Sequence, residues 1–486
     1  MSKVDQAPTR SAEIRRRLGH PVIDGDGHVV ELVRVFGDYV FDHGYGELIK
    51  AVPELAPSLA PEHRRPRREL SLEERRLGGV LQTSWHVPAS TEYYATVASP
   101  TRYYNRLGEA GIDFAVLYPT VGIGLLQLLE DERRVTLCRL YNEFMAEQYR
   151  SYGDRFTVAA LIPMHHPDEA IEAMRHATAL GAKVGLIPSH VRRPVPGETW
   201  PPDDRWASAR IAEWETHGWV DTFGLDSAYD YDPVWEEVIK LRLPLAAHTA
   251  GIGFSDRSSI SNFVYNQIGH FAASAGALAK SLFLGGVTHR FPDLRLALLE
   301  GGVAEGVAIY ISLVSNWKKR GGNSIGRLDP ATIDRGLFAK LITESDPSLS
   351  RYSPEDLLWA SGPKQAADDF AAVEIGSVED IRDRFCTNFF WGCEGDDPLV
   401  GLAFDSRITP LGARVPALLG SDLGHWDVPD FDEPLAEAYE LVEHGILDAE
   451  GFFDFVFRNP ARFYSSLNPD FFIGTSVEKE VAAALS

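Results

Sequence analysis

A regular alternation of short apolar runs with longer helical patterns constrains the fold of this chain more than any other feature. Runs of four to seven residues occur at 21–24, 113–119, 157–163, 183–188, 243–248, 294–300, 388–391 and 416–422, and the one at 388–391 is the weakest. Apolar runs of this length are typical of strands that are buried on both faces of a parallel sheet.

Helical patterns separate these runs. Residues 134–152 carry apolar side chains near helical spacing, residues 167–180 begin with Pro-Asp-Glu and end before Gly181, and a similar segment begins at Asp232. Proline and acidic residues in a first turn, and glycine after a last turn, mark helix boundaries. The repetition of strand and helix predicts an α/β fold, and about eight strands favour a closed (β/α)8 barrel of the TIM type.

The chain is long for one barrel, so we expect insertions within it. Residues 20–465 are predicted to form the barrel, 1–19 an N-terminal extension and 466–486 a C-terminal tail. The alternation is interrupted at about 50–100, which is rich in Pro, Arg and Glu, and at about 320–380, which holds Gly, Pro and polar clusters. Long loops of compact domains are often lids. We therefore expect both insertions to cover the C-terminal mouth of the barrel, with a dimer contact as the alternative.

Composition narrows the classes of partner and the compartment. A formal net charge of −23 disfavours nucleic acid and anionic membranes as partners. The three cysteines form no C-x-x-C pair and imply no disulfide framework, so a reducing cytoplasm is the expected compartment. We expect neither a signal peptide nor a membrane helix, because no apolar stretch reaches the roughly 18 residues that a span requires.

Side chains that bind metals well lie where the predicted strands end. Asp26 and His28 follow the first run, and residues at i and i+2 of an extended segment point to the same side. His248 ends the fifth run, Glu300 the sixth and Asp422 the eighth. Because the C-terminal ends of barrel strands surround the active site, we expect these five side chains to converge on a divalent cation. Oxygen and nitrogen donors without sulfur suit Zn, Mn or Fe.

Each of these residues also has a purely structural interpretation. An Asp-x-His pair is a weak motif, His248 could be a hydrogen-bonded core residue, and Glu300 or Asp422 could cap a helix. Buried carboxylates without a partner, however, cost several kcal/mol, so a cluster of three requires a cation. This cost favours the metal site.

Other residues near strand ends are candidates for supporting roles. Asp24 is placed to hydrogen-bond backbone beneath the metal, and Glu31 either to orient His28 or to cap a helix. His190 follows the fourth run and is a candidate to reach the mouth. Trp85, His86, Trp391 and Trp426 are candidate pocket walls, although aromatic residues more often pack in the core.

Nine short motifs resemble those of one enzyme family, in the family's order. They are 22–31 (VIDGDGHVVE), 107–113 (LGEAGID), 141–144 (YNEF), 154–156 (DRF), 243–248 (LPLAAH), 290–296 (RFPDLRL), 300–302 (EGG), 420–425 (GSDLGH) and 459–462 (NPAR). The chain thus resembles the amidohydrolase-related family (amidohydrolase family 2), which includes aminocarboxymuconate semialdehyde decarboxylase and resorcylate decarboxylase. Any one motif alone is not specific, but together they are.

The resemblance implies a barrel whose metal is held by Asp26, His28, His248 and Asp422, with Asp422 also serving as acid or base. A histidine that commonly takes part in proton transfer is replaced here by Glu300, which makes the site richer in carboxylate. His425, three residues beyond Asp422, is a candidate proton shuttle. The candidate catalytic residues are therefore Asp422, Glu300 and His425.

The leading hypothesis is a metal-dependent hydrolase or non-oxidative decarboxylase that acts on a small carboxylated or acyl substrate. Three carboxylates with two histidines also resemble a dinuclear non-haem iron centre, so an oxygenase of secondary metabolism with two Fe is the alternative. A non-catalytic ligand-binding barrel is disfavoured by the nearly complete ligand set. A homodimer is the default oligomeric state.

Overall fold

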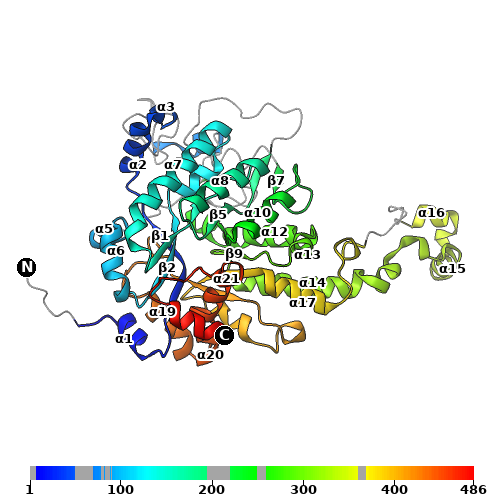
Figure 1. Ribbon diagram of the computed structural model, residues 1–486. Helices are drawn as coiled ribbons and strands as arrows, with labels where there is room; N and C mark the ends of the chain where they lie inside the picture. Colours follow the sequence, from blue (N-terminus) through cyan, green and yellow to red (C-terminus); the bar gives the residue numbers. More distant parts are fainter. Residues whose placement is uncertain are drawn as a thin grey trace, which may run out of the picture.

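Parallel strands form the centre of the molecule, and helices surround them (Figure 1). The computed structural model describes residues 7–49, 69–77, 82, 88, 90–193, 219–248, 259–358 and 368–486. The central strands are β1 (Ile23–Val29), β2 (Phe114–Pro119), β3 (Phe156–Val158), β4 (Ala160–Leu161), β5 (Gly185–Pro188), β8 (Leu245–His248), β9 (Leu296–Leu298), β10 (Phe389–Glu394) and β11 (Ala417–Gly420).

Backbone hydrogen bonds join these strands into a closed ring. Parallel pairing runs through β1, β2 and β3, and separately through β4, β5, β8, β9, β10 and β11. Ala159 N donates to Leu117 O at 2.9 Å, so β3 and β4 are two parts of one interrupted strand. At the seam between the first and last strands, His28 N donates to Leu423 O at 2.8 Å and Asp422 N donates to Asp26 O at 2.9 Å. The predicted (β/α)8 barrel is confirmed, with one strand at each of the eight apolar runs.

Helices connect the strands as the sequence signals predicted. The connecting helices include α7 (Asp131–Tyr149), α8 (Pro167–Ala179), α10 (Asp232–Leu241), α12 (His270–Leu284), α13 (Val287–Arg290), α14 (Val303–Arg320) and α17 (Val378–Asn388). At the start of α8, the Glu169 carboxylate accepts a hydrogen bond from His166 N at 3.1 Å. The helix ends before Gly181, whose φ of 93° is in the left-handed region that favours glycine.

The N-terminal insertion lies at the mouth, in the part that the structure describes. It includes α4 (Leu72–Leu77) and α5 (Thr91–Val97), followed by α6 (Pro100–Arg106). Val30 N, just beyond β1, donates to Val97 O, and Gly424 N, just beyond β11, donates to the Tyr93 hydroxyl at 3.0 Å. This segment therefore covers the ends of the first and last strands, as expected. Trp85 and His86 lie outside the described residues.

The second insertion lies elsewhere. Most of its described part, residues 321–358, is called the arm below and includes α15 (Arg335–Ser345) and α16 (Pro354–Leu357). Figure 1 shows these helices at the end of a projection that continues from α14 and α17. Because α14 begins beside Glu300 and has 18 residues, it carries the chain roughly 27 Å away from the mouth before the arm begins. The arm therefore projects from the barrel and does not cover the mouth of its own chain, contrary to our expectation.

The chain returns from the arm beside the point where it left. Trp317 Nε1 donates to Ile375 O at 3.4 Å, and Gly322 N donates to the Asp368 carboxylate at 3.1 Å. The segments that lead into and out of the arm are thus fastened together at the end of α14.

Shorter elements complete the fold. They are α1 (Arg10–Arg17), α2 (Val33–Val40), α3 (Gly46–Ile49), the hairpin β6 (Val191–Arg193) and β7 (Trp219–Asp221), α11 (Phe263–Gln267), α18 (Gly401–Phe404), α19 (Pro434–Glu443), α20 (Ala449–Phe453), α21 (Asn459–Leu467) and α22 (Glu478–Leu485). Among the helices of the described segments, none has both the length and the apolar character needed to cross a bilayer.

Candidate metal centre

Strand β1 carries two of the candidate ligands, Asp26 and His28, and both are buried. The backbone here approaches its neighbours closely. A Cβ at Gly25 would lie 2.9 Å from Leu418 Cδ1, and a Cβ at Gly27 would lie 2.6 Å from the Asp24 carboxylate. The Asp-Gly-Asp-Gly-His sequence therefore needs its glycines to fit beside β11 and Asp24.

The other candidate ligands lie at the ends of three more strands. His248 is the last residue of β8, Glu300 lies two residues beyond β9, and Asp422 lies two residues beyond β11. Glu300 and Asp422 have positive φ values of 51° and 49°. A non-glycine residue in this region costs of order 1–3 kcal/mol, and such strain is concentrated at functional sites.

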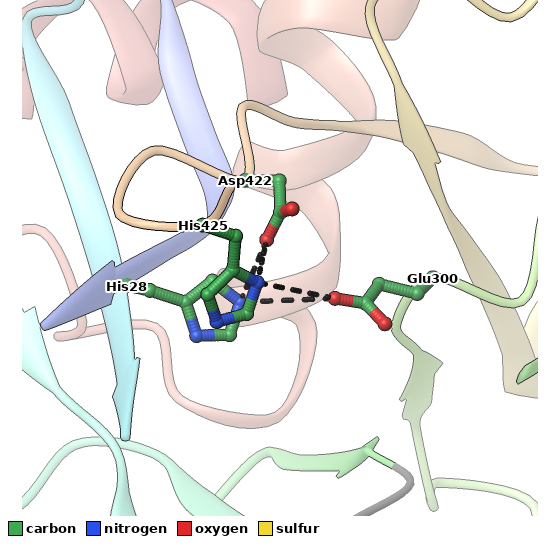
Figure 2. A group of neighbouring side chains, drawn as sticks. All are labelled: His28, Glu300, Asp422 and His425. Carbon is green, nitrogen blue, oxygen red and sulfur yellow. Dashed lines mark ion pairs between the residues drawn. The ribbon is translucent and has the colours of Figure 1, made fainter. Parts of the chain in front are cut away.

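Three of these side chains and His425 converge in Figure 2, where His28, Glu300, Asp422 and His425 point toward one another. His28 Nε2 lies 3.2 Å from Asp422 Oδ1 and 4.0 Å from Glu300 Oε1. His425 Nδ1 lies 2.5 Å from Asp422 Oδ1 and 3.8 Å from Glu300 Oε1. The four donor atoms all lie within 4.8 Å of one another, which is close enough for one ion to contact them all.

A second group shares His28 with the first. Asp26 Oδ1 lies 3.5 Å from His28 Nε2, and His248 completes this group within the same 4.8 Å limit. His248 Nε2 also lies 3.2 Å from Glu300 Oε1, which links the two groups. The structure thus brings together all five side chains that the sequence proposed as ligands, and it adds His425.

Burial shifts the pKa values of these groups in the directions expected for a dry site. The pKa values of Asp26 and Asp422 are raised well above the usual range for aspartate, chiefly because the carboxyls are buried. The pKa of His28 is lowered well below its usual range by burial and by the neighbouring His425 and His248. A divalent cation would favour ionised carboxylates and neutral imidazoles in this same space.

The donor atoms fit such a cation. Nε2 of His28, Oδ1 of Asp26 and Oδ1 of Asp422 are buried and make no hydrogen bond within the described part of the chain. Buried polar atoms are normally hydrogen-bonded, so an orphan set of this kind points to a ligand that binds all of them. The set contains carboxylate oxygens and imidazole nitrogens and no thiolate, which suits Mn or Zn.

Asp24 holds the two ligand segments together from below. Its carboxylate accepts hydrogen bonds from Asp26 N at 3.1 Å, from Ser421 N at 2.9 Å and from the Ser421 hydroxyl at 2.6 Å. Burial raises the pKa of Asp24 to about 6. These contacts confirm the prediction that Asp24 bonds backbone beneath the ligands, and they join β1 to the loop after β11.

His425 is held on both of its ring nitrogens. Nδ1 faces Asp422, and Nε2 lies 3.2 Å from the Thr120 hydroxyl. The backbone N–H groups of Val121 and Gly122 donate to the Glu31 carboxylate at 2.9 Å, as does the Tyr141 hydroxyl at 2.7 Å. Glu31 therefore caps the short helix that begins at Gly122, which was one of its two predicted roles. Thr120 carried no signal in the sequence, because a single hydroxyl after a strand has no motif.

The remaining candidates differ in where they lie. His190 is buried, burial lowers its pKa to about 3, and it belongs to neither group of donors. Trp391 is a core residue of β10. Trp426 packs against Phe263 of α11 with ring centroids 5.3 Å apart, and Phe271 lies 6.2 Å from the His248 ring. Aromatic side chains thus border the donors on the side of β8.

A model of the Amidohydrolase family matches residues 72–322, which is slightly more than half of the chain. The chain belongs to the amidohydrolase family. This confirms the resemblance that the nine motifs indicated, and it makes the protein a metal-dependent enzyme of the hydrolase or carboxy-lyase type. No curated protein matches the chain.

Solved structures of the same architecture are similar along almost the whole chain. An amidohydrolase from Mycobacterium avium subsp. paratuberculosis K-10 is 15% identical, with a TM-score of 0.50, and the match covers 92% of this chain and 100% of that one. At this identity the similarity supports the barrel fold and nothing finer.

Two decarboxylases are also similar. A dihydroxybenzoic acid decarboxylase from Polaromonas sp. JS666, solved with manganese and 2-nitroresorcinol, is 15% identical over 92% of this chain and 97% of that one, with a TM-score of 0.49. A 5-carboxyvanillate decarboxylase from Sphingomonas paucimobilis is 13% identical over 91% and 98% of the two chains, with a TM-score of 0.47.

Proposed function

We propose that Asp26, His28, His248, Glu300 and Asp422 hold one divalent metal ion, Mn or Zn, and that the enzyme cleaves a small carboxylated or acyl substrate by hydrolysis or non-oxidative decarboxylation. One observation carries this proposal: oxygen and nitrogen donors that follow four barrel strands form two groups at the mouth, each within 4.8 Å, and the two groups share His28. A cluster of buried carboxylates is costly without a cation, and its place at the strand ends is where barrel enzymes act.

The metal would polarise a carbonyl or carboxylate of the substrate, or lower the pKa of a bound water. The chain's own residues would handle the proton. Asp422 is in contact with His425 Nδ1, and the Thr120 hydroxyl is placed to donate to Nε2 of the same ring. In that arrangement the Thr120 hydroxyl holds one ring nitrogen of His425, and the other ring nitrogen faces Asp422. His425 and Asp422 together can then give a proton to, or take one from, a group bound beside them.

Glu300 occupies the place where the family resemblance suggests a histidine for proton transfer. Its Oε1 lies 3.2 Å from His248 Nε2 and within 4.0 Å of His28 Nε2, so it is in the middle of the donor set. We assign Glu300 to ligation and His425 to proton transfer. Replacement of Glu300 by Gln should therefore lower metal content, whereas replacement of His425 by Gln should lower turnover and leave metal content near normal.

The iron oxygenase alternative gains no support from the comparisons, which identify an amidohydrolase family and similar amidohydrolases and decarboxylases. The number of metals per chain separates the two proposals. About one Mn or Zn per chain in protein purified without chelator agrees with the hydrolase or decarboxylase, whereas two Fe per chain would contradict it.

The decisive experiment combines metal loading with product analysis. Protein reconstituted with Mn or Zn is incubated with a panel of small aromatic and aliphatic carboxylic acids, esters and amides, and release of carbon dioxide is measured beside release of the free acid. His28→Ala and Asp422→Asn are the inactive controls. Turnover that survives in both variants would place the chemistry elsewhere.

The three cysteines are unpaired, which supports a cytoplasmic location for this enzyme.

A further inference from the structure

A cavity of about 240 Å³ lies between α7, α8 and the strands β3 and β4. The two helices lie side by side on the barrel (Figure 1), and small side chains leave the space beneath them open. These are Ala146, Ala159, Ala160 and Ala177. Asn142 of α7 fixes one wall, since its side-chain amide exchanges hydrogen bonds with N and O of Leu161 at 2.7 and 3.0 Å. The cavity is therefore part of the packing of helices on strands.

This cavity lies toward the end of the barrel away from the mouth. Its lining includes Gly153, just before β3, Phe156, the first residue of β3, and Leu180 to Lys183, which precede β5. The candidate metal centre is instead at the C-terminal ends of the strands, and none of its six donor residues lines the cavity. A ligand of this cavity would therefore bind at a second site, apart from the metal centre.

The charged side chains that line the cavity are all basic. They are Arg150 and Lys183, and none of the lining residues in the described part of the chain is Asp or Glu. Acidic residues outnumber basic ones by 70 to 47 in the whole chain, so a space lined by cations alone runs against the overall charge. Cations beside apolar walls attract anions, because the walls screen their field less than water does.

The basic side chains have donors to offer to a ligand. Lys183 Nζ donates to the Phe471 carbonyl at 2.6 Å, which is a neutral acceptor. Burial lowers the pKa of Lys183, and no carboxylate opposes this shift. An ammonium group has three donors, so Lys183 can bind a further acceptor. Within the described segments, the Arg150 guanidinium and the Thr157 hydroxyl, which also lines the cavity, take part in no hydrogen bond or ion pair.

Helix ends alone do not account for these cations. Arg150 follows α7 and Lys183 follows α8, and cations are favoured at helix C-termini. The carbonyls of His176 and Ala177 at the end of α8, however, accept hydrogen bonds from the backbone N–H groups of Leu180 and Ala182 at 3.1 and 3.0 Å. The Lys183 ammonium bonds the C-terminal segment at Phe471 and not α8.

We propose that this cavity binds a small organic carboxylate with an apolar body, about the size of one aromatic ring. A cavity of about 150 Å³ can hold benzene, so 240 Å³ leaves room for a carboxylate as well. Met145, Phe156 and Leu180 line the space for the apolar body. Arg150 and Lys183 would hold the carboxylate, and a guanidinium can bind it through two N–H groups.

Fluorine NMR of 4-fluorobenzoate mixed with the full chain tests the proposal. Metal-free protein, prepared with a chelator and then dialysed, is used because the carboxylates of an empty mouth repel the probe. The dissociation constant should be about 1 mM or lower. Ala146→Leu fills the cavity and Arg150→Glu reverses a charge, and each should weaken binding at least about 10-fold. Neutral 4-fluorobenzyl alcohol should bind wild type more weakly by a similar factor.

Gln148→Glu is the matched control, because Gln148 is exposed on the same helix and does not line the cavity. It adds a negative charge to α7 and should leave binding within about twofold of wild type. Lys183→Met keeps the length of the side chain without its charge, and it should also weaken binding. Circular dichroism and thermal melting establish that each variant folds, which is expected because Leu is a good helix former and Arg150 is exposed.

Three results would overturn the proposal. They are no binding to wild type, binding that survives in Ala146→Leu and Arg150→Glu, and binding of the alcohol as tight as that of the carboxylate. Loss of binding in the cavity variants and its retention in Gln148→Glu would support the site. All these outcomes are read without metal or turnover, so they are independent of the proposed function.

Discussion

The barrel mouth and the arm show two opposite ways in which one chain uses its side chains. At the mouth, Asp26, His28, His248 and Asp422 are buried although each carries polar atoms, and the surrounding strands fix their positions. On the arm, Leu337 and Leu341 are apolar and yet half exposed. The mouth gathers donors that suit a small ion, whereas the arm leaves apolar side chains in contact with solvent. Both regions depart from the usual rule that apolar side chains are buried and polar side chains are exposed.

Loss of a central ligand should have the largest effect. His28→Ala removes the imidazole that both groups of donors share, so metal content should fall to a small fraction and activity by at least about 1,000-fold. His289→Ala is the matched control, because His289 is partly exposed on α13 and pairs with Glu374. Metal analysis and turnover check both variants. Normal metal content in His28→Ala would show that the mouth is not organised around an ion.

Matched leucine deletions should separate the two regions in stability. Leu418 of β11 is fully buried beside Gly25, so Leu418→Ala should lower the free energy of unfolding by about 2–5 kcal/mol. Leu337→Ala on the arm should change it by less than about 0.5 kcal/mol. Urea unfolding of both variants beside the wild type makes the comparison. Equal losses would mean that the arm is part of the barrel's cooperative unit.

Loss of Asp24, which holds the two ligand segments together, should reduce metal affinity less than loss of a ligand does. Asp24→Asn keeps the size of the side chain but replaces one acceptor oxygen by a donor, which faces the Ser421 hydroxyl. We expect metal affinity to fall about 10–100-fold, as for other groups that orient ligands. Ser421→Ala, which removes one of three hydrogen bonds to Asp24, should have a smaller effect. Competition with a chelator measures the metal affinity of both variants. Unchanged affinity in Asp24→Asn would show that Asp24 does not support the metal site.

An ion pair between Arg175 of α8 and Glu237 of α10 should have the smallest effect and a defined pH dependence. Hydrogen bonds from Arg175, and then from Lys240, lower the pKa of Glu237 to about 2. A lowered carboxylate pKa gives stability that is present above the unfolded pKa of about 4.5 and is lost as the pH falls toward 2. Glu237→Gln should therefore lower the free energy of unfolding near neutral pH by no more than about 1 kcal/mol. A difference from wild type that persists at about pH 2 would contradict this explanation.

Much of the barrel and of its donor set follows from local sequence. The strands could be located because buried parallel strands leave continuous apolar runs, and the weakest run, at 388–391, still became β10. The donor residues could also be predicted, because barrel geometry brings the strand ends together. Asp26, His248 and Asp422 could therefore be identified without knowledge of contacts between distant residues. The glycines before His28 indicated that the backbone here lies close to its neighbours. In the structure a Cβ at Gly27 would clash with the Asp24 carboxylate.

The other features of the site and the arm depend on contacts between distant parts of the chain, which no local sequence pattern records. Thr120 reaches His425 only because β2 lies beside β1, and Tyr93 reaches Gly424 only because its insertion folds over the seam. The direction of the arm depends on the length of α14. A short helix would have left the insertion near the mouth, whereas 18 residues carry it to the other end of the barrel.

The seam between β1 and β11 has a consequence for how the enzyme is made. Asp26 and His28 leave the ribosome early, and Asp422 leaves it near the end of synthesis. The carboxylate of Asp24 then bonds Ser421 across 397 positions of chain. Contacts between such distant residues form late and slowly. The proposed site is therefore complete only in a nearly finished polypeptide, because Asp422 is the last of its five proposed ligands to be synthesised.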